Sequence, residues 1–199
     1  MAQGNIGGLI LTRRRVQNNN ERRHCWWRHI RNRLFPRVGQ KIVVTRQQMA
    51  FFEPVDPFVA SSFPTWVVNG EEEGWYGAPI MRHGWVKVSN DLRGEVVDPD
   101  DHRDATTEFV VRARDFVERR IPGLAKDKLV GSRSCFYANT PDLDFIVDWA
   151  PGQSRILIAG GGSGHGFKFC GSIGPVIADA VEEKANRLGD LFRIGHRFD

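Results

Sequence analysis

The chain has 199 residues, of which 41% are hydrophobic, 11% aromatic and 26% charged. This composition is that of an ordinary soluble globular protein, and it excludes the collagen-like, disordered and disulfide-framework classes. The net charge of +4 is unevenly divided, because residues 1–40 carry a net charge of +8 and residues 41–199 a net charge of −4. The basic character is therefore confined to the first fifth of the chain.

The sequence contains no apolar run near the roughly 20 residues that cross a bilayer, so we expect no membrane contact. Its three cysteines, Cys25, Cys135 and Cys170, have neither CxxC spacing nor a histidine at metal-ligand spacing, which excludes a zinc site and a disulfide framework. The chain begins with apolar residues before its charges, the reverse of a secretory signal, and ends in no peroxisomal address. We therefore expect an intracellular protein, in the cytoplasm or the peroxisome, and the sequence leaves its oligomeric state open.

Residues 1–32 combine arginine clusters with Trp26 and Trp27 and lack any helical or strand period, so we expect this segment to pack poorly. One alternative function starts here, because an arginine-rich arm with aromatic residues is typical of nucleic-acid binding. The arginines follow no pattern and the rest of the chain is acidic. Nucleic acid is therefore not the partner we expect.

Residues 33–130 have a different pattern, of short strands and one helix. A β-branched run at Ile42–Thr45 and the pair Phe51–Phe52 precede three short segments, TWVVNG, WYGAPI and WVKVS, which predict an antiparallel meander. Apolar residues recurring at three and four predict a helix over residues 106–120, packed by one face on the sheet.

Residues 131–199 contain a Gly/Ser-rich approach to Cys135, a buried strand at Ile156–Ala159 and a glycine-rich loop at 160–166. A last helix is predicted from Ser172 to about Asn186, with Pro175 in its first turn. Together these elements predict an α+β fold with a mainly antiparallel sheet and a packed helix.

Several residues could carry chemistry, but each has a simpler interpretation. Lys87, between Val86 and Val88, would by local pattern extend to solvent; if buried, it is a fixed positive charge for a carboxylate, a reduced cofactor or superoxide. The glycine loop either turns tightly or binds an anionic ligand through backbone N–H groups, and it matches neither GxGxxG nor a P-loop. Taken alone, His165 is typical of a turn residue and Cys135 of a small buried hydrophobe.

Three motifs taken together suggest a family. CFYANTPD at 135–142, DFIVD at 144–148 and IAGGGSGHGFKF at 158–169 resemble the C-terminal part of the monomeric sarcosine oxidase family of flavoenzymes, which includes N-methyl-amino-acid and fructosyl-amino-acid (amadoriase) oxidases. The resemblance covers roughly residues 33–199. It implies a substrate-domain sheet over 33–130 and, over 131–199, a return of the chain to the FAD-binding domain.

The resemblance also implies roles for individual residues. Cys135 matches the cysteine that attaches FAD through a thioether, and Lys87 matches the lysine that lies over the flavin and assists reaction with oxygen. Tyr137 and Lys168 match residues of the substrate site, with the lysine neutralising the substrate carboxylate. The loop residues that would border the flavin are Gly162, Ser163, Gly164, His165, Gly166, Phe167 and Lys168.

The implied reaction is oxidation of a small secondary amine, such as an N-substituted amino acid. Two electrons pass to the flavin, water hydrolyses the imine, and oxygen reoxidises the flavin to give hydrogen peroxide. In sarcosine oxidases a histidine stands four residues after the lysine, whereas this chain has Asp91 there. This difference argues against sarcosine as the substrate.

The nucleotide-binding part of the family pattern is missing. Residues 1–40 contain no strand–GxGxxG–helix unit, since Gly4, Gly7 and Gly8 have neither a strand before them nor an amphipathic helix after them. We therefore expect a fragment with an incomplete FAD-binding domain, preceded by a segment 1–32 of doubtful coding origin. The alternatives are a catalytically incompetent truncated product and a partner that completes the flavin site of another chain.

Overall fold

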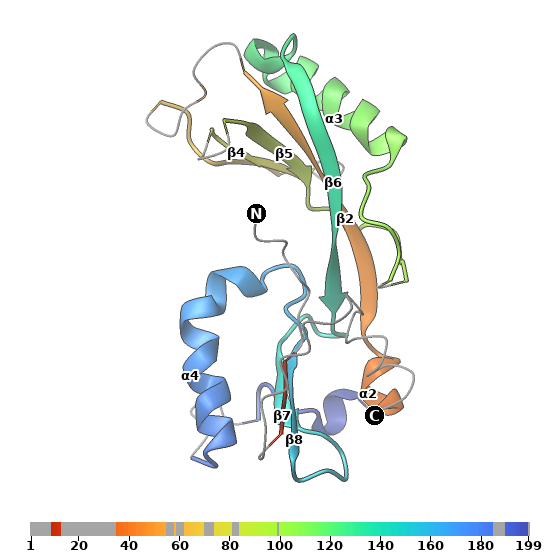
Figure 1. The fold of residues 1–199 in the computed structure, drawn as a ribbon, viewed down its shortest axis with the longest axis vertical. Coiled ribbons are helices and arrows are strands. Elements are labelled where there is room, and N and C mark those ends of the chain that lie inside the picture. The colour runs from red at the N-terminus through yellow and green to blue at the C-terminus, as the bar shows by residue number, and fades with distance from the viewer. Residues whose placement is uncertain are drawn as a thin grey trace. The chain divides into compact units, whose positions relative to one another are not determined.

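A computed structural model describes residues 9–12, 35–54, 58, 62–69, 74–80, 84–98, 100–184 and 190–198. Figure 1 shows the order of the elements along the chain. The strands are β1 (Leu9–Thr12), β2 (Val43–Glu53), β3 (Trp66–Val68), β4 (Trp75–Ala78), β5 (Val86–Asn90), β6 (Lys128–Asn139), β7 (Ile146–Trp149) and β8 (Ile156–Gly160). The helices are α2 (Pro36–Gly39), α3 (Thr107–Arg120) and α4 (Cys170–Val181), with 3-10 turns η2 (Pro122–Leu124), η3 (Gly166–Phe169) and η4 (Gly195–Phe198).

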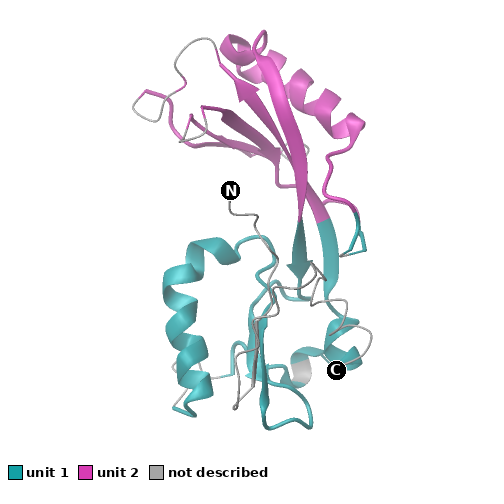
Figure 2. Cartoon of the chain, in the orientation of Figure 1, with its two compact units in different colours: residues 1–45, 96–101, 136–199 teal, residues 46–95, 102–135 magenta. Residues whose placement is uncertain are grey.

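The chain divides into two compact units (Figure 2). Unit 1 comprises residues 1–45, 96–101 and 136–199, and unit 2 comprises residues 46–95 and 102–135. The domain boundaries expected from the sequence, at residues 32 and 130, stay predictions.

Unit 2 is built on the antiparallel meander that the sequence predicts. The strands lie in the order β3-β4-β5-β2-β6, and β3 pairs with β4, β4 with β5 and β5 with β2, all antiparallel. Alternate residues of these strands, such as Phe52, Val86 and Val88, are fully buried against α3. Because strand side chains alternate, the residues between them lie on the opposite face of the sheet.

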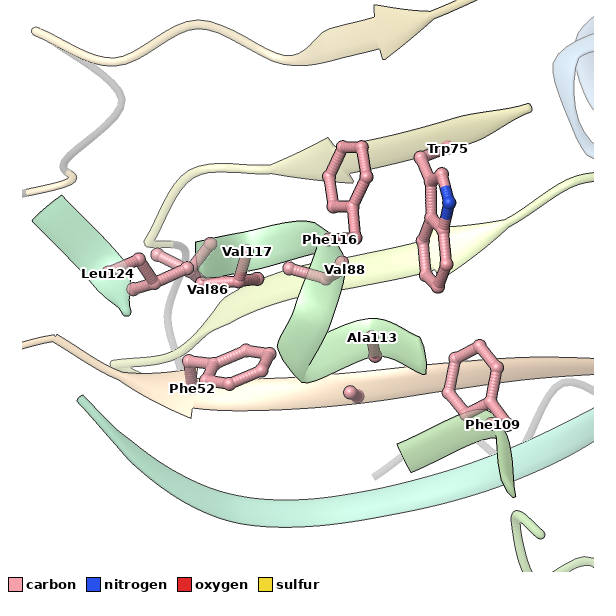
Figure 3. Close-up of a cluster of buried hydrophobic side chains, with 10 residues drawn as sticks. Phe52, Trp75, Val86, Val88, Phe109, Ala113, Phe116, Val117 and Leu124 are labelled. Atoms are coloured by element: carbon pink, nitrogen blue, oxygen red, sulfur yellow. The ribbon is translucent and has the colours of Figure 1, made fainter. Parts of the chain in front are cut away.

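Helix α3 confirms the prediction over residues 106–120. Its first turn is capped by the Thr106 hydroxyl, which accepts a hydrogen bond of 3.2 Å from the Phe109 amide. Phe109 and Phe116 are buried, and each stacks on Trp75 of β4 (Figure 3). The aromatic contacts therefore fix the helix on one face of the sheet and leave the other face for a site.

Unit 1 contains a second antiparallel sheet, with the strand order β1-β8-β7. Its core includes Ile146 of β7, Ile158 of β8 and Val38 of α2. Residues 1–32 show no helical or strand period and were expected to pack poorly, yet Leu9–Thr12 pair with β8. A strand edge offers unpaired backbone groups, which a four-residue β-prone run can satisfy without showing a period.

Two further elements differ from expectation. β6 is a 12-residue strand where the sequence indicated a Gly/Ser-rich approach to Cys135. Helix α4 begins at Cys170 rather than Ser172 and ends at Val181, so Pro175 lies inside the helix and not in its first turn. Because proline has no N–H, Pro175 cannot donate the helical bond of its position.

The α+β class itself is confirmed by this mixture of helices and antiparallel strands. In the described ranges, no helix combines the length and apolar character that crossing a membrane requires.

Candidate functional site

Lys87 lies on the face of the unit 2 sheet that turns away from α3. It stands in β5 directly between Phe51 of β2 and Ala78 of β4, while its neighbours Val86 and Val88 are buried in the core. Its side chain is half-buried, and its Nζ donates a hydrogen bond of 3.3 Å to the Tyr76 hydroxyl and lies 4.6 Å from the centroid of that ring. The positive charge is therefore held at the sheet by Tyr76.

Cys135 of β6 shares this face. The guanidinium carbon of Arg133, two residues earlier on β6, lies 5.6 Å from the Phe51 ring centroid. Phe51 stands directly opposite Lys87, so Arg133 and, by strand alternation, Cys135 lie on the same face as Lys87. The sequence suggested separate roles for Lys87 and Cys135, and the fold brings the two residues to one face of unit 2.

The Cys135 thiol is half-buried, and its ionisation reflects two opposing influences. The pKa of the thiol lies above its ordinary value, because burial deprives the anion of hydration and the charges of Lys87, Arg103 and Arg133 offset only part of that rise. Arg103 is held beside the strand, since its carbonyl accepts a hydrogen bond of 2.7 Å from the Ser134 amide.

Asp91 follows β5 four residues after Lys87. Burial raises the pKa of its carboxyl group, and the charge of Lys87 opposes that rise. The site in unit 2 thus combines a lysine with an acid and a thiol, each of which is influenced by the charge of that lysine.

The glycine loop belongs to unit 1, and two of its positions exclude any side chain. Gly161 has φ +70°, and a Cβ there would lie 2.6 Å from Cγ2 of Thr140. Gly164 has φ +85°, and a Cβ there would lie 2.4 Å from Cε2 of Tyr137. Both values lie far inside van der Waals contact, so the loop requires glycine for space as well as for conformation.

Ser163 fixes the turn between these glycines. It adopts φ +45°, and its amide donates to the Ala138 carbonyl. Its hydroxyl accepts a hydrogen bond of 3.2 Å from the Thr140 amide and lies 3.1 Å from the Gly161 carbonyl, to which it can donate. The loop is therefore held against the end of β6 by hydrogen bonds as well as by shape.

The remaining loop residues differ in exposure. The Nε2 atom of His165 lies 2.9 Å from the Leu143 carbonyl oxygen, and its ring packs edge-on against Phe145. Phe167 is 89% exposed, and Lys168 is exposed with its Nζ 5.3 Å from the Phe169 ring centroid. Gly162 and Gly166 are partly buried beside Phe145.

The structure brings the predicted residues together in two groups. Lys87 and Cys135 lie in unit 2, whereas Tyr137 packs on Gly164 and belongs with Lys168 to unit 1. The roles that the resemblance implies for Lys87, Cys135 and Lys168 are divided between the two units and stay predictions. The arginine-rich segment with Trp26 and Trp27 lies outside the described residues.

Tyr76 is the residue that the sequence analysis missed. It stands two residues before Ala78, the register partner of Lys87, and therefore on the same face. The meander was predicted, so the available signal was the strand register, which would have placed this hydroxyl beside the lysine.

Comparison with known proteins agrees with the resemblance. The family model described as FAD dependent oxidoreductase matches residues 25–180. Monomeric sarcosine oxidase from Bacillus sp. (strain NS-129) is 34% identical over 138 residues, covering 67% of this chain and 35% of the relative. N-methyl-L-tryptophan oxidase from Shigella sonnei is 32% identical over 152 residues, covering 73% of this chain and 40% of the relative.

Among solved structures, amadoriase I from Aspergillus fumigatus matches with a TM-score of 0.62 and 24% identity, over 77% of this chain and 38% of that structure. This likeness supports the fold. Since the family model matches more than half of its residues, the chain belongs to the FAD-dependent oxidoreductase family. It spans 35% to 40% of the length of the relatives named here.

The residues present fit an FAD group. A half-buried thiol on the same face as a lysine offers a nucleophile and a fixed positive charge, and the glycine loop has bare backbone at Gly161 and Gly164, where a side chain has no room. FAD dependence follows from the family, and the attachment chemistry belongs to the proposal below.

Proposed function

We propose that this chain supplies the oxygen-reactive and substrate-facing part of an amine oxidase that oxidises secondary amines such as N-substituted amino acids and releases hydrogen peroxide. The observation that carries the proposal is the placement of Lys87 and Cys135 on one face of the unit 2 sheet, with the lysine charge acting on the thiol. Relatives named for sarcosine, N-methyl-L-tryptophan and fructosyl amines support the substrate class.

FAD would be held by Cys135, through a thioether to the flavin ring, and by the backbone of the loop from Gly162 to Lys168. When bound, FAD supplies the acceptor for the two electrons of the amine. The glycine at position 164 lets the loop backbone pass close to the Tyr137 ring. That arrangement lets backbone groups approach a planar ligand.

The two lysines have different tasks in this proposal. Lys87, held by Tyr76, places a positive charge where oxygen gains negative charge during its reduction. Lys168 is exposed beside Phe169, and its ammonium pairs with the carboxylate of an amino-acid substrate while Tyr137 lines the same site.

Lys87→Met tests the oxygen role. In the FAD-loaded chain supplied with N-methylated or fructosylated amino acids, we expect this change to slow peroxide formation about 100-fold, the usual effect of removing one preorganised charge. Electron transfer to an artificial dye should fall much less, since the dye does not need the lysine. Lys128→Met, at an exposed position of β6, is the matched control and should keep full activity.

Equal loss with oxygen and with the dye would contradict the role of Lys87. A chain that binds no FAD and forms no peroxide with any of these amines would instead favour the alternative of a catalytically incompetent product.

A further inference from the structure

Arg133 lies in the same strand as the Cys135 thiol and on the same face of the sheet. It lies two residues before Cys135 on β6, and strand alternation puts both side chains on one face of the sheet. Its side chain is exposed, and its guanidinium carbon lies 5.6 Å from the centroid of the Phe51 ring.

The Phe51 ring that contacts Arg133 is itself held in place by its neighbours. Its centroid lies 5.8 Å from that of Trp85, and Phe51 stands directly opposite Lys87 in the strand register. An aromatic ring orients a guanidinium and leaves its charge in place, whereas a carboxylate would neutralise that charge. Arg133 therefore presents its full positive charge on the face of Cys135.

The charged groups that act on the thiol come from three segments. They are Lys87 of β5, Arg103 of the segment before α3, and Arg133 of β6 itself. The Asp91 carboxyl group interacts electrostatically with Lys87. From β2, the residue opposite Lys87 is the uncharged Phe51. The ammonium group of Lys87 donates a hydrogen bond to the Tyr76 hydroxyl. The guanidinium of Arg133 differs, because the contact described for it is with the Phe51 ring.

We propose that Arg133 is a positioning residue that, together with Lys87 and Arg103, increases the fraction of Cys135 present as the thiolate, the form that attaches a flavin. This inference rests on the proposed function for the attachment step alone, in which the sulfur would replace one hydrogen of a methyl group on the flavin ring and the two electrons released would pass through the flavin to oxygen. The thiolate itself is a property of the chain and can be measured without a cofactor. Burial favours the neutral thiol, and a nearby fixed cation opposes this by stabilising the anion.

The test follows alkylation of each cysteine by iodoacetamide across pH, resolved by peptide mass spectrometry, in the full chain without FAD. We expect Arg133→Gln to shift the pH profile of Cys135 upward and to slow its alkylation about threefold below the midpoint, the effect of one charge screened by water. The two profiles should converge at high pH, where both thiols are ionised. Salt at 1 M should narrow the difference, because it screens an exposed charge.

Three comparisons separate charge from structure. Arg133→Lys should keep most of the wild-type profile. Arg112→Gln removes an equivalent arginine contact, 5.9 Å from the Trp75 ring centroid on the α3 side, and should change nothing at Cys135. Cys170, which is exposed, serves as the reference thiol within each sample and should react alike in all variants.

If the pH dependence of Cys135 alkylation is unchanged in Arg133→Gln, the inference is overturned, regardless of whether FAD becomes attached. A second arm measures the FAD that stays with the chain after acid precipitation, as a time course. If the thiol profile shifts and the attachment slows in proportion, both proposals are supported. If the profile shifts but no FAD ever attaches, the inference holds and covalent attachment fails.

Discussion

At position 164 of the loop, both the available space and the backbone conformation require glycine. The Tyr137 ring occupies the space that a Cβ would need, and the backbone has φ +85°. Either condition alone disfavours a side chain, and here the two act together.

Gly164→Ala should therefore destabilise the protein by about 1–3 kcal/mol, through backbone strain and displacement of Tyr137. Urea unfolding followed by tryptophan fluorescence measures the change. Gly171→Ala is the matched control, since a Cβ at position 171 of α4 meets nothing within 4 Å. It should be neutral or stabilising by up to about 1 kcal/mol, and an equal loss in both variants would argue against the steric account.

At the residue scale, sequence reasoning could nominate side chains but could not assemble them. Lys87 and Cys135 were both singled out, yet the local pattern also favoured an exposed lysine and an inert cysteine. Their common face depends on the register of β5 on β2 and on the direction of Arg133 in β6, which are properties of the folded sheet.

Among the elements, the turn η4 is joined to the β6–β7 connection by one arginine. Arg197 donates two hydrogen bonds, of 2.5 and 2.7 Å, to the Asp142 carboxylate, and a third, of 3.0 Å, to the Phe145 carbonyl. This pairing lowers the pKa of Asp142 to about 2. The ion pair thus stabilises the end of unit 1.

Because the folded pKa of Asp142 is below its ordinary 3.8, its contribution to stability is complete above about pH 4 and is lost as the pH falls through 2. Asp142→Asn should cost about 1 kcal/mol at pH 7, given the partial exposure of the pair, and the difference from wild type should shrink toward pH 2. Urea unfolding at several pH values measures it. Asp190→Asn, in the exposed pair with Arg193, should cost almost nothing; a difference for Asp142→Asn that does not depend on pH would contradict the assignment.

Elements with a clear hydrophobic period were predictable from the sequence. Elements stabilised mainly by pairing with a neighbouring strand were not. The apolar spacing of Phe109, Ala113 and Phe116 predicted α3 correctly. β6 was missed because Gly131, Ser132 and Ser134 have low strand propensity, and its strand conformation comes from its place beside β2 in the sheet. The start of α4 was misplaced because Pro175 is tolerated inside the helix.

For the whole molecule, the family assignment rests on three motifs that lie in different parts of the fold. The cysteine strand, the β7 segment and the glycine loop follow one another in the chain, and their order carried the resemblance that the family model bears out. The two units each contain a part of the predicted site. The central claim is that the thiol of unit 2 holds the flavin.

Peptide mass spectrometry after incubation of the chain with FAD tests that claim most directly. We predict that the peptide containing Cys135 gains the mass of the flavin and that the peptide containing Cys170 does not. Recovery of both peptides unmodified, from a chain shown by circular dichroism to be folded, would contradict the account.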